Sequence, residues 1–460
     1  MFRSSRLAPF LLFAAALGGF ALTLSLFYPG LTTPDSDFQL MQTRSFSFSD
    51  GHPPIMALFW SVMIKFMDGP APMMLAFAAL YWGSFFMLAR TLAATAGKGA
   101  AVLLLACAFS PLLLNYAGVI WKDVFVFNLF LLAFTLTFSS LAHGRRMSAP
   151  AFAGVAVLIL IGSLGRHNSI FSGLPLMVLA LYAFQRDSAR TGAGFLRLAA
   201  RGSVLYLVLL FLAYHIVKLI AQPAPTSPSS TLFVFDLIGM SLQTQQYLLP
   251  ASKTYTLASL QTCYDPAGWD RVWLSCTPLL EELRGDGSWA QLSSYWFEAV
   301  SAHPMEYLQH RLYHFGALFT PTWLVFVNDP TPLAAEFGFT KDAGFLLFDR
   351  MMLALRTNPV LGILFTNGFW IVVNTLLLMF SMFRVWRSCS THNVAIFLLL
   401  LSGFLYSSPF ILIGTAPDFR YVYWSIGACL VSTSLYAARY GARQASPAGP
   451  APMGAAAASA

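Results

Sequence analysis

Four ionisable side chains lie close together near the start of the chain, in "TTPDSDFQLMQTRSFSFSDGHPPIMALFW" (32–60). They are Asp35, Asp37, Asp50 and His52. Carboxylates and an imidazole at this density can take a proton from a hydroxyl group or bind a charged ligand. Because the chain is 57% hydrophobic and only 10% charged, these groups need a position outside the hydrocarbon of a membrane.

The composition is typical of a polytopic membrane protein. The 460 residues include 42 Phe and several apolar runs of about 20 residues, the length that crosses a bilayer as a helix. Alternation of apolar and polar residues with period two is absent, which favours helices over barrel strands. We therefore predict an all-α polytopic membrane protein with about ten transmembrane helices, at 8–28, 72–89, 99–117, 124–142, 151–165, 168–185, 203–221, 359–383, 393–413 and 421–438.

A further apolar stretch, 53–67, has only fifteen residues, so on length alone it can be counted as a span or not, and the charges decide. It begins with Pro53-Pro54 and contains Lys65. If it does not cross and the N-terminus is cytoplasmic, the short inner segments satisfy the positive-inside rule. Those inner segments contain a single acid, Asp187, and these basic residues: Arg3, Arg6, Arg90, Lys98, Arg145, Arg146, Arg186, Arg190, Arg197, Arg201, Arg384, Arg387, Arg439 and Arg443. We interpret 53–67 as a re-entrant or juxtamembrane helix in the first outer loop.

This topology places nearly all ionisable residues near the membrane on one face. They are Asp35, Asp37, Asp50, His52, Lys122, Asp123, Arg166, His167, Asp418 and Arg420. Acids and cations gathered at one interface indicate an active site at the boundary between lipid and water. The same sidedness accounts for the net charge of +8 without a nucleic-acid partner.

The topology also divides the chain into segments. We predict an N-terminal transmembrane module (1–221) with a catalytic first outer loop (29–71), a small extracytoplasmic domain (222–358), C-terminal transmembrane helices (359–438) and a disordered cytoplasmic tail (439–460). Cys263 and Cys276 fall in the extracytoplasmic domain, where oxidising conditions favour a disulfide, although one pair alone leaves the pairing open.

A set of short motifs follows the outer face. They are Tyr28-Pro29-Gly30, Asp35-Ser36 with Gln39, His52-Pro53-Pro54, Lys122-Asp123, Arg166 with Asn168, and Arg420-Tyr421. With these motifs the chain resembles the GT-C integral-membrane glycosyltransferases, and most closely uncharacterised bacterial branches of that superfamily. The sequence departs from the pattern in two ways. Ser36 separates the two aspartates, which are often adjacent, and His167 stands where Asn is expected.

The resemblance implies a transfer reaction and a role for each motif residue. A sugar would move from a polyprenyl-phosphate donor to a glycan or lipid acceptor of the cell envelope, at the outer face of a bacterial inner membrane with both termini cytoplasmic. Either Asp35 or Asp37 would be the general base. His52, Lys122, Arg166 and Arg420 would bind the donor phosphate, and Gln39, Asp123, Asn168 and Tyr421 would bind substrate. No metal ligands are assigned and no cofactor is certain. A divalent cation, Mg²⁺ or Mn²⁺, bound through Asp35, Asp37 and His52 stays open, since the hard carboxylate oxygens suit these ions.

Other interpretations of these residues stay open at this point. "TPDSDFQ" also reads as a helix start with Ser36 as N-cap and Gln39 completing a capping box. Lys122-Asp123 also fits a local interfacial pair beside Trp121, and Arg166 and Arg420 fit ordinary phospholipid headgroups.

Two other function classes are also weighed. An oligosaccharide polymerase or ligase acting on lipid-linked glycans is the main alternative function. A transporter is less favoured because the predicted spans have few ionisable residues near the membrane midplane.

Overall fold

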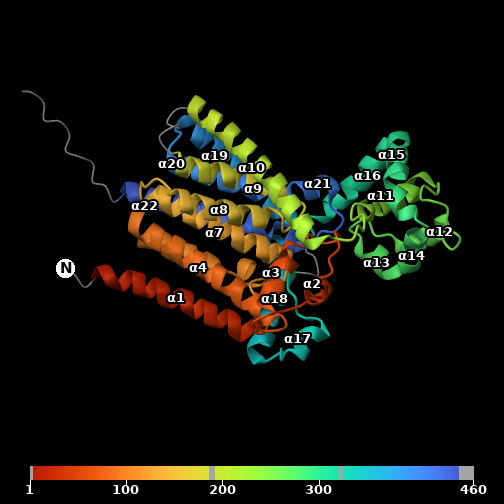
Figure 1. Cartoon of the computed structure of the whole chain (residues 1–460), viewed down its shortest axis with the longest axis horizontal. Coiled ribbons are helices and arrows are strands. Elements are labelled where there is room, and N and C mark those ends of the chain that lie inside the picture. The colour runs from red at the N-terminus through yellow and green to blue at the C-terminus, as the bar shows by residue number, and fades with distance from the viewer. Residues whose placement is uncertain (1–3, 186–191, 321–324, 445–460) are drawn as a thin grey trace, which may run out of the picture.

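The chain folds into helices. The computed structural model describes residues 4–185, 192–320 and 325–444 (Figure 1). Within these ranges the regular structure is helical, apart from two isolated β-bridges that join Leu31 to Val119 and Ser49 to Ala224. The all-α fold predicted from the composition is therefore confirmed.

Most helices lie side by side in one bundle (Figure 1). They are α1 (Ser4–Phe27), α4 (Ala71–Thr95), α5 (Lys98–Ala108), α7 (Lys122–Ala142), α8 (Ala149–Ser163), α9 (Ser169–Phe184), α10 (Gly192–Ala221), α19 (Asn367–Arg387), α20 (Thr391–Ser407) and α22 (Tyr423–Gln444). Of the described helices, α1, α4, α7, α10, α19 and α20 with its extension to Ile413 are long and apolar enough to cross a membrane. The apolar helices α5, α8 and α9 are shorter. The protein is thus a polytopic helical membrane protein.

Two of the predicted spans are interrupted, and a proline accounts for one of the breaks. The predicted span 99–117 is not one helix, because α5 ends at Ala108 and the short α6 (Pro111–Leu114) follows. Pro111 has no N–H to continue the hydrogen bonds of α5. With 11 residues, α5 is about 16 Å long, well short of the ~30 Å hydrocarbon core. The later predicted span 359–383 likewise starts with η4 (Leu361–Phe365) before α19 begins.

Two helices lie between the first span and α4, where the sequence predicts the first outer loop. They are α2 (Pro34–Ser45) and α3 (Ile55–Met63). Helix α3 has 9 residues, or about 14 Å, and cannot cross a bilayer. It packs against α2 and α4 and buries Trp60. A short helix of this kind is what the sequence predicts for 53–67.

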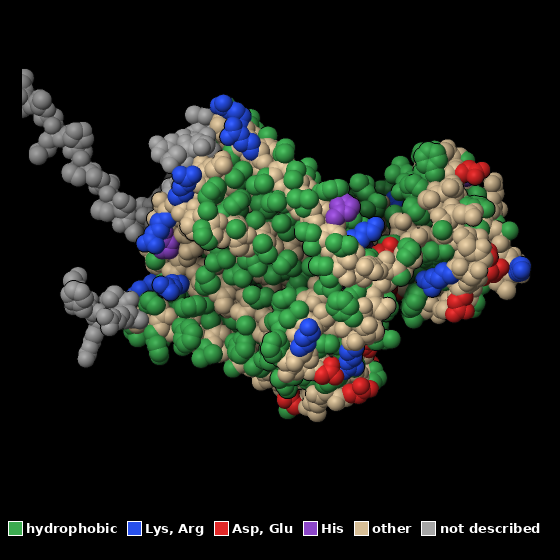
Figure 2. Space-filling view, in the orientation of Figure 1, with side chains coloured by type: hydrophobic (Ala, Val, Ile, Leu, Met, Phe, Trp, Pro, Cys, Tyr) green, Lys and Arg blue, Asp and Glu red, His purple; other side chains and the backbone are tan. Residues whose placement is uncertain are grey.

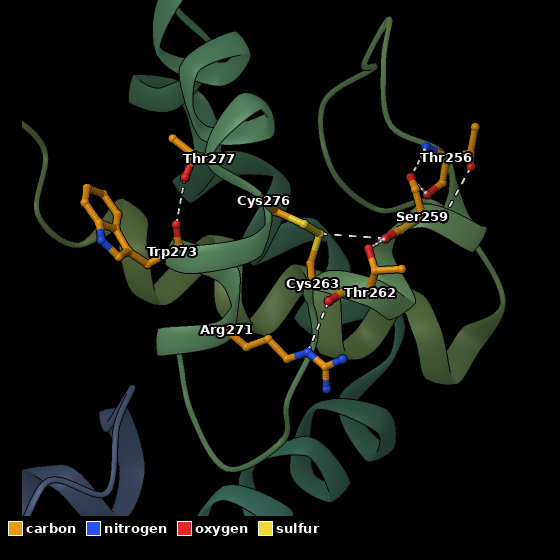
Figure 3. The surroundings of a disulfide bond; sticks show 8 residues. All are labelled: Thr256, Ser259, Thr262, Cys263, Arg271, Trp273, Cys276 and Thr277. Carbon is orange, nitrogen blue, oxygen red and sulfur yellow. Dashed lines mark hydrogen bonds between the residues drawn. A yellow bond between two sulfur atoms is a disulfide. The ribbon is translucent and has the colours of Figure 1, made fainter. Parts of the chain in front are cut away.

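A second group of helices has its own hydrophobic core at one end of the bundle (Figure 1). It consists of α11 (Ser230–Thr244), α12 (Leu257–Cys263), α13 (Asp270–Ser275), α14 (Thr277–Gly285), η2 (Ser288–Gln291), α15 (Leu292–Ala302) and α16 (Pro304–Ala317). We call this group the outer domain. A disulfide between Cys263 and Cys276 joins the end of α12 to the residue before α14 (Figure 3).

Residues 325–358, the last part of the predicted segment 222–358, contribute side chains to the main core of the bundle. Helix α17 (Pro332–Glu336) is followed by α18 (Ala343–Thr357), which packs against α1 and buries Phe345 and Phe348 in the main core. The second core therefore draws on a smaller part of the chain than the predicted domain.

Charged side chains divide between the two ends of the molecule. On the face drawn in Figure 2, hydrophobic side chains cover the sides of the bundle, and the acidic side chains lie at the end that carries the outer domain and α17. Lys and Arg side chains form a cluster at the opposite end, and others lie among the acidic side chains. Helix α22 runs to Gln444, so the first residues of the predicted tail 439–460 are helical, and 445–460 lie outside the described residues.

Candidate active site

Helix α2 presents Asp35 at the end of the bundle. The helix begins at Pro34 after the N-cap residue Thr33, whose N–H donates to Ser36 Oγ at 3.1 Å. The alternative N-cap at Ser36 is therefore wrong, since Ser36 is the third residue of the helix. Proline suits the first turn because its missing N–H would have no helical partner. This start places Asp35 in the first turn, with Gln39 one turn later on the same face.

Arg420 binds Asp35 and a second carboxylate. Arg420 Nη1 donates to Asp35 Oδ2 at 2.7 Å, and its Nε donates to Asp418 Oδ2 at 3.2 Å. The guanidinium also lies over the Trp121 ring, 4.6 Å from the centroid. Arg420 comes from η5 (Phe419–Val422), just before α22, so the contact joins the two ends of the chain.

His52 connects Asp35 to Lys122. Its Nε2 lies 3.7 Å from Asp35 Oδ1, and its Nδ1 faces the Lys122 ammonium at hydrogen-bond distance. Burial, together with the charge of Lys122, lowers the pKa of His52 from 6.5 to about 3. The imidazole is therefore neutral at neutral pH. We assign the tautomer in which Nδ1 accepts from Lys122 and the Nε2–H faces Asp35.

Asp123 and Arg166 form the second charged pair of the site. Arg166 Nη1 donates to Asp123 Oδ1, and Tyr406 Oη donates to the same oxygen at 2.9 Å. Asp123 is only 1% exposed. Lys122 and Asp123 therefore do not pair locally, because each has its partner on a different element.

Two aromatic rings support Arg166. The rings of Phe410 and Tyr421 stack with centroids 4.4 Å apart and an interplanar angle of 9°. The Arg166 guanidinium lies 4.7 Å from the Tyr421 centroid, and the Arg420 guanidinium lies 5.4 Å from it. Tyr421 thus contacts both arginines of the site.

A pocket of about 390 Å³ opens beside these pairs. Its polar lining is Lys122, Arg166, His167 and Asn168, and its apolar lining is Pro53, Phe171, Pro409, Phe410 and Ile413. Short α21 (Pro409–Ile413) supplies one wall. Since Lys122 belongs both to the pocket and to the His52–Asp35 contacts, the cationic pocket adjoins the carboxylate.

The remaining predicted site residues, Asp37, Gln39 and Asn168, are not part of the contacts around Asp35 and Lys122. Asp37 points to the other side of α2, where Thr331 Oγ1 donates to its Oδ1 at 2.9 Å. Gln39 is buried, and its Oε1 and Nε2 have no hydrogen-bond partner among the described residues. Asn168 Nδ2 donates to the Tyr406 carbonyl at 2.7 Å and so ties α9 to α20.

The sequence interpretation missed several residues of the site. They are the pocket residues Phe171 and Phe410 and the supporting residue Tyr406, whereas the sequence places His167, Trp121 and Asp418 near the outer face without a role of their own. Pro409, which follows Ser407-Ser408 inside the predicted span 393–413, is a sequence signal for the helix break that forms one wall of the pocket.

The two aspartates of α2 differ in their electrostatics. Burial opposes ionisation of Asp35, but the charges of Arg420 and Lys122 outweigh it and hold the pKa of Asp35 well below its ordinary value. Burial raises the pKa of Asp37, which has hydroxyl partners and no cation beside it. Asp35 is thus ionised in the free protein.

The set Asp35, Asp37 and His52 does not fit a divalent cation. Asp35 is already paired with Arg420, and Asp37 lies on the other side of α2. A metal ion beside Asp35 would meet the charges of both Arg420 and Lys122. In the part of the chain that the structure describes, no other group of three His, Cys, Asp or Glu side chains is placed to hold a metal.

Acid is expected to destabilise the fold partly through His52. With a pKa of about 3 in the folded protein and 6.5 as the ordinary value, the unfolded chain binds more protons between these pH values. Stability due to His52 therefore falls as the pH drops through this window. His52→Gln removes this contribution, so the melting temperature of the variant should fall less than that of the wild type between about pH 7 and pH 4. Thermal unfolding across this range checks it, and parallel curves would contradict it.

Comparison with known proteins gives only distant similarities. No family model matches the sequence, and no curated protein matches it. Similar solved structures include the archaeal oligosaccharyltransferase AglB from Archaeoglobus fulgidus in complex with an inhibitory peptide and a dolichol-phosphate (12% identity, TM-score 0.41, covering 95% of this chain and 51% of that chain). An oligosaccharyltransferase from the same organism in complex with Zn and sulfate gives 12% identity and a TM-score of 0.40, covering 94% and 50%.

ArnT from Cupriavidus metallidurans bound to undecaprenyl phosphate is also similar. It gives 15% identity and a TM-score of 0.34, covering 93% of this chain and 77% of that chain. The chain spans about half the length of the two archaeal proteins. With TM-scores below 0.5, these similarities carry no conclusion about the family or the activity of this chain.

Proposed function

We propose that the chain is a membrane glycosyltransferase of GT-C type that moves a sugar from a polyprenyl-phosphate donor to an acceptor at the outer face of the bacterial inner membrane. The observation that carries the proposal is the pocket in which Lys122 and Arg166 adjoin apolar side chains. His52 contacts both Lys122 and Asp35, so it connects this pocket to the carboxylate. A lipid phosphate combines an anionic head with an apolar chain, and this pocket offers partners for both.

The polar part of the pocket suits the donor phosphate. Lys122, Arg166 and His167 line it together, and charge-assisted hydrogen bonds from such donors are the stronger ones. They would also stabilise the negative charge that grows on the phosphate as the sugar leaves. Phe171 and Ile413 line the same pocket, and each is 55% exposed. Their side chains would contact the first isoprene units.

Asp35 is the proposed general base. The acceptor hydroxyl oxygen forms a bond to the anomeric carbon while the bond from that carbon to the phosphate oxygen breaks. The hydroxyl proton passes to Asp35, and the electron pair of the broken bond leaves with the lipid phosphate. In the free protein Asp35 is a weak base because Arg420 and Lys122 lower its pKa. A bound phosphate would share these cations, which raises the basicity of Asp35 when the donor is present.

The orientation is part of the same proposal. The site lies at the end of the bundle that carries the outer domain, opposite the end where Lys and Arg gather in Figure 2. By the positive-inside rule the basic end is cytoplasmic, so the site faces the periplasm.

Removing the Lys122 ammonium is expected to weaken donor binding. Lys122→Met keeps the length of the side chain and loses one charged donor, which corresponds to about a 10- to 100-fold rise in the dissociation constant. Undecaprenyl phosphate titrated into the protein in nanodiscs, followed by native mass spectrometry, measures this constant. The matched control is Lys341→Met, which removes an exposed lysine that pairs with Asp329 away from the pocket. Equal affinity of Lys122→Met and wild type would count against the pocket as the donor site.

A further inference from the structure

The outer domain contains a buried charged cluster that the proposed reaction does not use. Asp236 and His310 are fully buried, and Arg311 is nearly so. His310 Nε2 donates to Asp236 Oδ1 at 3.0 Å, and Arg311 forms an ion pair with the same oxygen. Trp296 Nε1 donates to Asp236 Oδ2 at 2.7 Å, and Tyr264 Oη lies 2.8 Å from His310 Nδ1.

Stability alone does not account for such a cluster. Buried ion pairs lose hydration, and well-packed apolar residues of similar volume are often at least as stabilising. Arg311 also makes a contact that leaves the outer domain. Its Nη1 donates to the Gly414 carbonyl at 2.6 Å, in a buried position. Gly414 directly follows α21, whose Phe410 and Ile413 line the pocket.

The Cys263–Cys276 disulfide (Figure 3) closes a loop. This loop contacts the same segment. The N–H of Trp269 donates to the Thr415 carbonyl at 2.6 Å. A Cβ on Gly268 would lie only 3.2 Å from both Pro417 and the Thr415 carbonyl, so the two backbones are in close contact. The disulfide-closed loop and Arg311, which both belong to the outer domain, therefore both contact the segment 414–417.

The segment 414–418 joins two parts of the candidate site. Before it lies α21 with the apolar wall of the pocket, and after it come Arg420 and Tyr421. From the bundle, Asn367 Nδ2 donates to the carbonyls of Pro417 and Asp418 at 2.8 and 3.0 Å. Four carbonyls of this short segment thus accept hydrogen bonds from three other elements.

We propose that Arg311 is a positioning residue through which the outer domain fixes the segment 414–418 and thereby sets the position of Phe410 in the donor pocket and of Arg420 beside Asp35. The description of this pocket as a donor site rests on the proposed function. The positioning itself rests on the contacts of Arg311, Trp269 and Asn367.

Arg311→Met tests this directly. Hydrogen exchange of the amides between 415 and 422 should become faster, while exchange in α14 stays protected because the outer domain remains folded. A remote substitution that displaces a substrate-binding side chain commonly lowers kcat/KM by about 10- to 100-fold. Here the loss should appear in KM for the lipid donor more than in kcat. Arg311→Lys keeps one donor and should recover part of both effects.

Two further variants make the result specific. Arg271→Met is the matched control, because Arg271 is exposed and donates to the Thr262 carbonyl within the outer domain (Figure 3). Gly414→Ala disturbs the same contact from the bundle side, since its Cβ would lie 2.8 Å from His314 Nε2 and 2.5 Å from the Phe410 carbonyl. It should speed exchange of the same amides even if Arg311→Met fails to fold.

The outcomes separate the two proposals. Unchanged exchange between 415 and 422 in Arg311→Met and Gly414→Ala, or an equal change in Arg271→Met, overturns the positioning role. Wild-type protein that fails to bind undecaprenyl phosphate in nanodiscs overturns the donor site, and the exchange result still decides whether Arg311 holds the segment.

Discussion

Asp35→Asn is expected to lower the rate of sugar transfer by about 10²- to 10⁴-fold, the usual contribution of a positioned general base. The amide keeps the size of the side chain and its place beside Arg420 but cannot take the acceptor proton. Glycan on the outer surface of cells that carry each variant in place of the wild type, measured by mass spectrometry, provides the readout. Undecaprenyl phosphate binding should persist, because Lys122 and Arg166 remain.

Asp37→Asn is the matched control for this experiment. Asp37 lies two residues from Asp35 but faces Thr331, and burial raises its pKa. We expect its activity to stay close to that of the wild type. Loss of activity in Asp37→Asn alone would transfer the role of base to Asp37, and full activity in both variants would exclude the carboxylate mechanism.

Arg166→Met is expected to destabilise the protein by about 3–5 kcal/mol, the cost of breaking a buried ion pair from one side. The change leaves Asp123, which is 1% exposed, with only the Tyr406 hydroxyl as a partner. Thermal unfolding in detergent should show a clearly lower melting temperature than the wild type.

A second substitution tests the physical reason for this loss. Asp123→Asn in the Arg166→Met background removes the uncompensated charge and should recover much of the stability. Arg145→Met changes an exposed arginine at the other end of the bundle and should stay within about 0.5 kcal/mol of the wild type. Wild-type stability of Arg166→Met would show that the pair is not important for the fold.

Sequence patterns predict the sidedness of the site well. Apolar runs identify helices. The short loops rich in Lys and Arg identify which loops lie on the same side of the membrane, because cytoplasmic loops carry an excess of these residues. This is enough to place Asp35, His52, Lys122, Arg166 and Arg420 at one end of the bundle. The structure joins Asp35, His52, Lys122 and Arg420 by direct contacts. Arg166 pairs with Asp123 and lines the pocket together with Lys122.

Which charged side chains pair with each other could not be predicted from their neighbours in the sequence. Lys122 and Asp123 are adjacent in sequence, but successive side chains of a helix point about 100° apart. Lys122 therefore meets His52, and Asp123 meets Arg166. The same geometry separates Asp35 from Asp37 once α2 begins at Pro34. The contacts of Arg311 depend on how the outer domain packs, which no local pattern encodes.

The half-exposed Phe171 and Ile413 give the pocket an apolar entrance. A lipid carrier that enters past these two side chains reaches the pocket laterally, from within the membrane leaflet, whereas the acceptor hydroxyl comes from water. Saturation of the enzyme by its carrier would then depend on the number of carrier molecules per unit of membrane area, and extra detergent or lipid would dilute that substrate even at constant molar amounts.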